Sequence, residues 1–511
     1  MKRLTALLLC AALLLLLSSC GGNTPEEPGS TAATGDTVSA APSDAAASQE
    51  QLITVPYTSA DSLDPFEAKS EVNRELMYLI HAGLFYLNSS MTPVRLLASG
   101  EVVEGTSVRV DIREDACFSD GSSITASDVT ASFERAKNSA LYSGQLAGIE
   151  SAAVTGTHSV SFKLSGADIF VLNCLTFPIV SGQGKQLIGA GKYYIDSTGD
   201  APVLHLNRYC PVYSLSQNNV LELHDIAQSS GARFAFMTGD ADVYTDTMED
   251  YSFERLSSKT VTVSTNKLVY IGANTSGSSL ASWEWLRRVI NIGLDRAAVG
   301  GASFRGQALP ASTPFNPALY ALEGLELTGD AGDPARAAVL LEENGFDSLN
   351  ADGYRTNGRL SLRLTLLVCE DNPFKTELAT RVADMLKELG IRIAVDKRDT
   401  EQYKEALKAG DYELYIGEVN LCDNLNLSPF FSSSGAAHYG INDEHSQSYT
   451  SFVQGKTDIT AYIESFYLQV PFIPVCYRTA VMSYNPDYSG VEAEFADMYA
   501  SIYLWSTGSV S

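Results

Sequence analysis

The chain has 511 residues, of which 45% are hydrophobic and 9% aromatic, and acids outnumber bases 61 to 35, giving a formal charge of −26. This length can hold about two to four domains with real cores, and the apolar content excludes a disordered chain. The excess of acids argues against sequence-independent nucleic-acid binding, which depends on clustered Lys and Arg.

The first twenty residues are typical of an export signal. Lys2 and Arg3 precede an almost wholly apolar run that ends at Leu17, shorter than the roughly 18 to 20 residues needed to span a bilayer core. The run continues into Ser18-Ser19-Cys20-Gly21, which resembles a bacterial lipobox. We therefore predict a lipoprotein signal peptide and lipobox over residues 1–20 and an extracytoplasmic protein anchored to the bacterial cell membrane by lipidated Cys20. The alternative is an ordinary signal peptide with an incidental cysteine.

Residues 21–50 are rich in Gly, Ser, Thr, Ala and Pro and contain no Lys or Arg. This composition predicts a disordered tether, which as a random coil would span roughly 30 Å. No later apolar run is long enough to cross a membrane, so we do not expect a channel or permease.

Six cysteines follow the lipobox, and they are widely scattered: Cys117, Cys174, Cys210, Cys369, Cys422 and Cys476. Because no Cys-x-x-Cys occurs, we expect buried free thiols rather than a disulfide framework.

The remaining chain predicts alternating strands and helices. We expect strands at 52–55, 108–112, 266–274, 360–368, 391–395 and 414–416, and helices at 71–84, 129–137, 282–300, 334–344, 376–390 and 400–410. Thr125 with Asp128 three residues later is a helix start, and Pro334 suits a first helical position. The alternation implies a sheet with crossover helices.

The motifs of common enzymes and metal sites are missing. Neither Gly-x-Ser-x-Gly nor His-Glu-x-x-His occurs, and Thr450 stands where a phosphate loop ending in Gly455-Lys456-Thr457 would need glycine. Arg359 stands where a calcium loop over 348–359 would need glutamate, and the spacing of His438 and His445 matches no zinc pattern. We predict no enzyme, no metal and no cofactor; an exported hydrolase would need a nucleophile and base that the sequence does not show.

Several short segments together resemble the family 5 extracellular solute-binding proteins, the oligopeptide, dipeptide and nickel group of ABC-importer components. The matching segments run in the family's order from about residue 51 onward: Leu63-Asp64-Pro65, His81 to Phe85, Phe118 to Ser122 with Ile124 to Val129, Gly189 to Tyr193, Gly293 to Arg296, Asp333 to Phe346 and Val470 to Val475. Three features depart from the family pattern: Lys192 replaces a proline, Arg208-Tyr209-Cys210 lacks a following tryptophan, and the region between Phe177 and Gly189 is short.

The resemblance implies an α/β, two-lobe periplasmic-binding-protein-like fold (type II, large cluster), with an extra subdomain inserted in lobe 1. On this basis we divide the chain into lobe 1 (51–88, 187–268 and 484–511), the inserted subdomain (89–186) and lobe 2 (269–483). Ligand would bind between the lobes and favour closure to the extent that it contacts both. The partners implied are an ABC permease with its ATPase subunits and, through the N-terminal lipid, the membrane; we expect a monomer that binds no nucleic acid.

The resemblance also implies ligand-binding residues. A buried ammonium needs a negatively charged partner. The family places an acid for the peptide's α-ammonium shortly after the strand matched by 414–416. In this chain we predict that Asp423 takes that role, with Glu418 as the fallback. The other candidates are Asn420, Asn424 and Asn426 for amide contacts, Ser70 and Glu71 from lobe 1, and Tyr439 and Trp283 as aromatic walls. For each of them, turn formation, solvent exposure or core packing is the structural alternative.

We therefore predict a lipid-anchored protein that captures short peptides and delivers them to a permease. A binder of nickel-chelate, haem or another small cationic solute is one alternative. A lipoprotein that senses peptides without transport is another.

Overall fold

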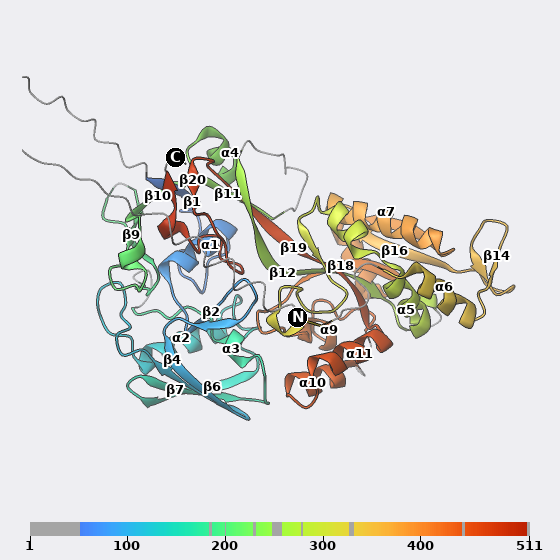
Figure 1. Ribbon diagram of the computed structural model, residues 1–511, viewed down its shortest axis with the longest axis horizontal. Coiled ribbons are helices and arrows are strands. Elements are labelled where there is room, and N and C mark those ends of the chain that lie inside the picture. The colour runs from blue at the N-terminus through green and yellow to red at the C-terminus, as the bar shows by residue number, and fades with distance from the viewer. Residues whose placement is uncertain are drawn as a thin grey trace, which may run out of the picture. The chain divides into compact units, whose positions relative to one another are not determined.

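The computed structural model describes residues 52–182, 187–199, 201–227, 231–247, 258–276, 279–325, 332–441 and 445–507 (Figure 1). The predicted signal peptide, Cys20 and the tether over 21–50 lie outside these residues. The described part folds as an α/β protein with three sheets of four or more strands.

Lobe 1 is built on a sheet with the order β1-β10-β9-β8. Its strands are β1 (Ile53–Tyr57), β8 (Tyr193–Asp196), β9 (Val203–Leu206) and β10 (Val220–Asp225), with β1 parallel to β10 and the other pairs antiparallel. Helix α1 (Glu71–Ile80) packs on this sheet through Leu76, Met77, Leu79 and Ile80, and α4 (Gly231–Thr238) follows β10. The predicted first strand and first helix are confirmed.

Helix α1 ends four residues earlier than the sequence predicts. His81 is extended, with φ −122° and ψ 157°, and the backbone of Gly189 to Gly191 packs against the helix end. Gly191 N donates to Ile80 O at 3.0 Å, and a Cβ at Gly189 or Gly191 would collide with the carbonyls of Ile80 and Leu79. The two glycines are therefore needed for this close approach.

The chain between β1 and β8 forms a second sheet, with the order β4-β5-β7-β6. It contains β4 (Ala98–Glu104), β5 (Ser107–Ile112), β6 (Ile149–Gly156) and β7 (Ser159–Leu164), and short elements β2 (Phe85–Leu87), β3 (Pro93–Arg95) and α3 (Val171–Cys174) flank it. Helix α2 (Ala126–Asn138) contributes Phe133 to the core beneath it, against Phe162. The capping box of Thr125 and Asp128 opens α2, as the sequence predicts.

The third sheet has seven strands with the path β11-β19-β12-β18-β16-β17, onto which β13 pairs beside β19; β11 lies at its lobe 1 end, and β16 and β18 lie in lobe 2. The strands are β11 (Val243–Asp246), β12 (Lys259–Ala273), β13 (Ala308–Pro310), β16 (Arg363–Cys369), β17 (Arg392–Arg398), β18 (Leu414–Asn420) and β19 (Phe472–Tyr484). The helices are α5 (Glu284–Gly293), α6 (Pro334–Glu343), α7 (Pro373–Glu388), α8 (Thr400–Ala409), α9 (Ser428–Phe431), α10 (Ser446–Val453) and α11 (Ile459–Gln469). Crossover helices α7 and α8 join parallel strands β16, β17 and β18, which confirms the predicted alternation.

Strands β12 and β19 run from one lobe into the other. Val263 and Met482, near one end of the pair, lie in the lobe 1 core with Leu76 of α1, whereas Ile271 and Ile473, near the other end, lie in the core of lobe 2. Between these ends the register of the pair shifts between residues 264 and 267 of β12. This bulge marks the passage from lobe 1 to lobe 2.

The helix predicted over 282–300 is interrupted. Helix α5 ends at Gly293 because Leu294 is extended and buried in the lobe 2 core, and a π-helical turn, η3 (Ala297–Gly301), follows. Asp295 restarts the helical backbone, since its Oδ1 accepts from Ala298 N at 2.9 Å. The stretch compared with a calcium loop instead contains a hairpin of β14 (Ser348–Leu349) and β15 (Arg355–Thr356).

All six cysteines after the lipobox are free; Cys174 and Cys476 are buried and the other four are partly buried. Within the described ranges, no helix is both long and apolar enough to cross a membrane.

Arg296 is fully buried and joins three parts of lobe 2. Its Nε donates to Ala311 O and Pro474 O, both at 2.9 Å, and its Nη2 donates to Asn291 Oδ1 at 2.6 Å. One guanidinium thus satisfies carbonyls next to β13, in β19 and in α5. This is the physical role of the arginine in the Gly293 to Arg296 motif.

We expect Arg296→Leu to lower the free energy of unfolding by about 3 kcal/mol or more, because several buried acceptors lose their donor. Urea unfolding followed by circular dichroism measures this. Arg288→Leu, which removes a partly exposed ion pair with Glu284 on α5, is the matched control and should cost less than about 1 kcal/mol. Equal losses in the two variants would contradict the role assigned to Arg296.

Candidate functional site

Asp423 lies just after β18, beside the bulge of β12. Leu421 N donates to Asn266 O at 3.0 Å, and Asn266 Nδ2 donates to Asp423 Oδ1 at 3.0 Å. Asn266 is held in turn by Asn316, whose Nδ2 donates to Asn266 Oδ1 at 3.4 Å and to Thr265 O at 3.0 Å. The predicted ligand acid is therefore fixed by a residue of the strand that crosses between the lobes.

The carboxylate of Asp423 has no cationic partner within the described part of the chain. Burial raises its pKa to about 6, and the hydrogen bond from Asn266 opposes this rise. Glu418, the fallback candidate, differs: its carboxylate lies 2.9 Å from Arg478 Nη1 and 3.5 Å from Lys375 Nζ. Glu418 is thus already neutralised, whereas Asp423 is a desolvated acid without a counter-ion.

Two residues of α1 that the sequence analysis did not select, Arg74 and Tyr78, belong to the electrostatic surroundings of Asp423. Arg74 and Tyr78 are exposed one turn apart on a helix whose intervening residues are buried. Tyr78 keeps 45% of its surface exposed, yet burial raises its pKa well above the usual value. The signal available in the sequence was the pair of polar side chains four apart on an otherwise apolar helix.

The negative charge of Asp423 also acts on tyrosines outside lobe 2. Burial is the main cause that raises the pKa of Tyr78 and of Tyr142; Asp423 adds to this rise, while the guanidinium of Arg74 opposes it. Asp497, which lies 3.5 Å from Lys192 Nζ, also acts on Tyr78. These residues are the electrostatic surroundings of the predicted ligand acid.

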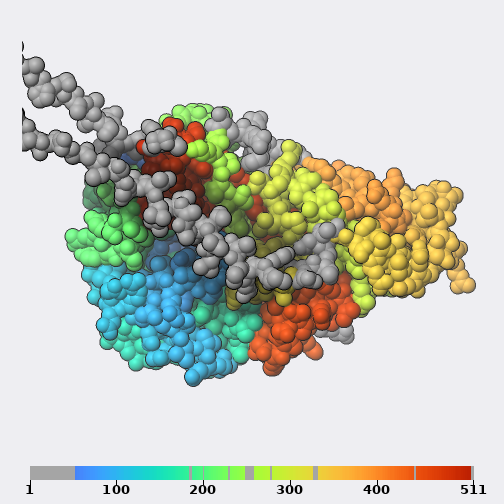
Figure 2. All heavy atoms as spheres, viewed as in Figure 1, coloured from blue at the N-terminus to red at the C-terminus, as the bar shows by residue number. Residues whose placement is uncertain are grey.

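Direct contacts join the inserted subdomain to lobe 2 at the loop that carries Asp423. Asn173 Nδ2 donates to Asp423 O at 3.1 Å, and Asn424 Nδ2 donates to Gln145 O at 3.3 Å. Phe170 packs against Phe452 of α10 with 5.7 Å between ring centroids. Figure 2 shows the orange-red atoms of α10 and α11 adjoining the teal atoms of the subdomain. The loop that carries Asp423 is therefore held from both lobes.

The other predicted residues fall into three groups. Asn424 is buried in the contact just described, and Asn420 and Asn426, exposed and half-buried respectively, lie on either side of it. Ser70 and Glu71 begin α1, one turn before Arg74, with Ser70 N donating to Asp61 Oδ2 at 2.6 Å. The three asparagines thus flank Asp423 in the chain, and Ser70 and Glu71 lie at the start of the helix that carries Arg74 and Tyr78.

Tyr439 and Trp283 are not brought together with Asp423. Tyr439 accepts a hydrogen bond from Tyr415 OH at 3.4 Å near the far end of β12 and β18, roughly 20 Å along the strands from Asp423. Trp283 caps α5 and stacks on Trp285 with 5.4 Å between ring centroids, packed onto the lobe 2 core. Both aromatics therefore pack onto lobe 2, and core packing is the structural alternative that the sequence analysis gave for them.

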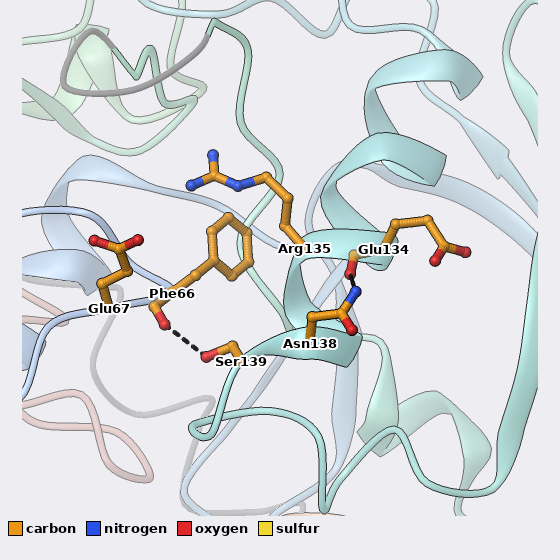
Figure 3. Close-up of a pocket in the computed structure, with 6 residues that line it drawn as sticks. All are labelled: Phe66, Glu67, Glu134, Arg135, Asn138 and Ser139. Carbon is orange, nitrogen blue, oxygen red and sulfur yellow. Dashed lines mark hydrogen bonds between the residues drawn. The ribbon is translucent and has the colours of Figure 1, made fainter.

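A surface pocket of about 400 Å³ lies between residues 66–67 of lobe 1 and the end of α2 in the inserted subdomain. It is lined by Phe66, Glu67, Glu134, Arg135, Asn138 and Ser139 (Figure 3). Its polar groups are satisfied locally: Arg135 Nη2 lies 2.6 Å from Asp64 Oδ2, and Ser139 Oγ donates to Phe66 O at 2.6 Å. Because no lobe 2 residue lines it, closure of the lobes would not enclose a ligand there.

The two neighbouring histidines are separately engaged. His438 Nδ1 contacts Gly435 O, and His445 Nδ1 lies 2.8 Å from Gln469 Oε1. Within the described ranges, no group of three or more His, Cys, Asp or Glu side chains is placed to hold a metal ion.

We expect Asn266→Ala to raise the pKa of Asp423 above about 6, because the variant removes the hydrogen bond that favours the ionised form. NMR titration of 13C-labelled aspartate carboxyls measures the shift. Asn420→Ala, at the exposed end of the neighbouring strand, is the control and should leave the titration unchanged. An unaltered pKa in Asn266→Ala would show that Asn266 does not hold the carboxylate in solution.

Comparison with known proteins identifies the family to which this fold belongs. The model of the bacterial extracellular solute-binding proteins, family 5 Middle, matches residues 92–437. The glutathione-binding protein GsiB of Salmonella typhi is 21% identical over 367 residues, which cover 67% of this chain and 68% of GsiB.

Two solved structures show the same two-lobe fold. NikA from Brucella suis, in complex with Fe(III)-EDTA, superposes with a TM-score of 0.68 at 18% identity, covering 89% of this chain and 100% of NikA. The oligopeptide-binding protein AppA from Bacillus subtilis, in complex with a nonapeptide, gives 0.57 at 18% identity, covering 89% of this chain and 98% of AppA. Because the family model matches more than half of its length, the chain belongs to the family 5 bacterial extracellular solute-binding proteins, non-enzymatic substrate-binding components of ABC importers.

Proposed function

We propose that this protein captures short peptides between its lobes and delivers them to an ABC permease. Asp423 binds the peptide's α-ammonium, and the space between the lobes accommodates the backbone that follows. The protein acts as a monomer, with the residue limits of lobe 1, the inserted subdomain and lobe 2 that the sequence analysis assigns.

The unpaired carboxylate of Asp423 carries this proposal. A desolvated acid costs free energy unless a cation meets it, and nearby Glu418 shows that the fold neutralises an acid when its role is structural. A peptide ammonium would supply the missing charge. Because Asp423 is on lobe 2 and α1 is on lobe 1, a ligand that contacts both would favour closure.

The relatives support a peptide as the ligand and leave one other class of ligand as an alternative. GsiB is named as a glutathione-binding protein and AppA was solved with a nonapeptide. NikA was solved with a metal chelate, so a chelate or another small cationic solute is the second candidate. A peptide sensor without transport would bind the same ligand and differ only in its partner.

We expect peptide affinity to fall about tenfold from pH 7.5 to pH 5, because protonation of Asp423, with its pKa of about 6, removes the charge that meets the ammonium. The α-amine, with a pKa of about 8, is mostly protonated over this range and becomes more so toward pH 5. In Asp423→Asn, affinity should be low and nearly independent of pH when measured by isothermal titration calorimetry. Asp168→Asn removes the other acid whose pKa is raised to about 6 and should retain the pH dependence. A pH-dependent Asp423→Asn would contradict the assignment.

The ligand class can be identified directly. Native mass spectrometry of protein that begins at residue 21, purified without refolding, should show a spread of adduct masses corresponding to short peptides, and Asp423→Asn should lose them. A single non-peptide mass or a stoichiometric metal would instead favour the chelate alternative. Permease-dependent uptake of the identified peptides would then separate transport from sensing.

We further propose that Cys20 carries the lipid that holds the protein at the membrane. Cys20→Ser should leave the folded protein intact, move it from the membrane to the soluble fraction and remove the diacylglycerol mass from its N-terminus. Cys10→Ser, within the predicted signal peptide, is the control and should stay membrane-bound. A membrane-bound Cys20→Ser protein would exclude this anchor.

A further inference from the structure

The inserted subdomain contacts lobe 2 through its backbone as well as through side chains. Ile169 N donates to Val453 O at 2.9 Å, and Tyr320 N donates to Ser90 O at 2.9 Å. Each bond joins a loop of the subdomain to a segment of lobe 2. Backbone groups on one side are thus satisfied by backbone groups on the other, as in the interior of a single domain.

The same contact buries apolar side chains of the subdomain. Met91 and Phe170 are 0% and 2% exposed and belong to a hydrophobic cluster whose other members lie mostly in lobe 2. The ring of Phe170 lies 5.7 Å from that of Phe452, which packs in turn against Phe315 at 5.6 Å. Separating the subdomain from lobe 2 would expose Met91 and Phe170 to water. This exposure costs free energy whether or not a ligand is bound.

Asn173 ties the contact to the loop that carries the proposed ligand acid. It is 1% exposed, and its Nδ2 donates to Met91 O at 3.3 Å and to Asp423 O at 3.1 Å. Its own carbonyl accepts from Gln145 Nε2 at 3.1 Å, and Gln145 O accepts from Asn424 Nδ2 at 3.3 Å. Separation would break the bonds from Asn173 to Asp423 and from Asn424 to Gln145, each of which adds to the cost.

The backbone on both sides of the contact is strained. Met91 and Leu425 are buried and left-handed, with φ 56° and 58°. Residues other than glycine keep this conformation only where their surroundings fix it. Both carbonyls accept bonds from side chains, Met91 O from Asn173 Nδ2 and Leu425 O from Tyr449 OH at 2.6 Å. The two strained turns indicate a contact with one defined geometry.

We propose that the inserted subdomain is a latch that holds lobe 2 closed in the unliganded protein, so that the lobes open only transiently to exchange ligand. The latch consists of Ser90, Met91, Ile169, Phe170 and Asn173 on the subdomain and Tyr320, Asp423, Phe452 and Val453 on lobe 2. A ligand then adds to a closed state that already predominates. This inference goes beyond the proposed function and does not depend on which ligand binds.

Two backbone N–H groups report directly on the latch. Ile169 N and Tyr320 N donate across it, so their exchange with deuterium, followed by mass spectrometry, measures how often it opens. The full-length protein in detergent is first freed of co-purified ligand by reversible unfolding, and native mass spectrometry verifies the removal. In the wild type, both groups should exchange at least about tenfold more slowly than in the unfolded chain.

Two substitutions on the subdomain should loosen the latch. Phe170→Ala removes the ring contact with Phe452 and should speed exchange at Tyr320 N by about tenfold or more. Asn173→Ala removes the bond to Asp423 O and should act in the same direction. Since Tyr320 pairs with Ser90 and touches neither substituted side chain through a hydrogen bond, a faster exchange there shows that the contacts open together.

Two controls separate latch opening from loss of folding. The N–H groups of β5, at the centre of the subdomain sheet, and of β16, inside the large sheet, should keep their wild-type rates in both variants. Asn138→Ala removes an exposed asparagine of the same subdomain, whose side chain donates to Glu134 O on α2, and it should change none of the rates. If Phe170→Ala also speeds exchange in β5, Asn173→Ala alone decides.

Exchange at Ile169 and Tyr320 as fast as in the unfolded chain would overturn this inference, because the unliganded lobes would then be open. An unchanged rate at Tyr320 in Asn173→Ala would also overturn it, because the contacts would then not act as one latch. Neither result bears on the proposed function, since the measurement contains no peptide.

Discussion

The pairing of β12 with β19 is the constraint on which the other features depend. The two antiparallel strands contribute residues to the cores of both lobes, so each lobe is completed by the same pair. Their register shifts between residues 264 and 267, at the passage between lobes. Asn266 lies in this shift and holds Asp423. The proposed ligand acid is thus fixed where a relative movement of the lobes would bend the strands.

Two acids near the end of β18 show how the fold treats buried charge. Glu418 contacts Arg478, whose side chain is 1% exposed, and Lys375, so its negative charge is compensated within the protein. Asp423, five residues later, receives a hydrogen bond from a neutral amide but no cation. This uncompensated charge lowers the stability of the folded protein, as is common where a group serves binding rather than folding.

Local motifs predicted much of the fold because their causes are local. The capping box at Thr125, the crossover helices of lobe 2 and the strand at 108–112 follow from side chains within a few residues of each other. The end of α1 and the break after Gly293 were missed because distant contacts cause them: the backbone of Gly189 to Gly191 meets α1, and Leu294 turns into the lobe 2 core. Asp423 came from a resemblance in strand order, whereas the hydrogen bond from Asn266 that holds it appears only once β12 and β18 are paired.

The sequence by itself determined the family, the α/β class with its order of strands and helices, and the acid-bearing segment after 414–416. These depend on hydrophobic periodicity, capping and short motifs, which act over neighbouring residues. Only the tertiary structure decided which acid is compensated, that Asn266 holds Asp423, and that Tyr439 and Trp283 pack onto lobe 2 instead of joining Asp423. The physical reason is that charge compensation and burial depend on distances between residues far apart in the chain, which a linear pattern does not contain.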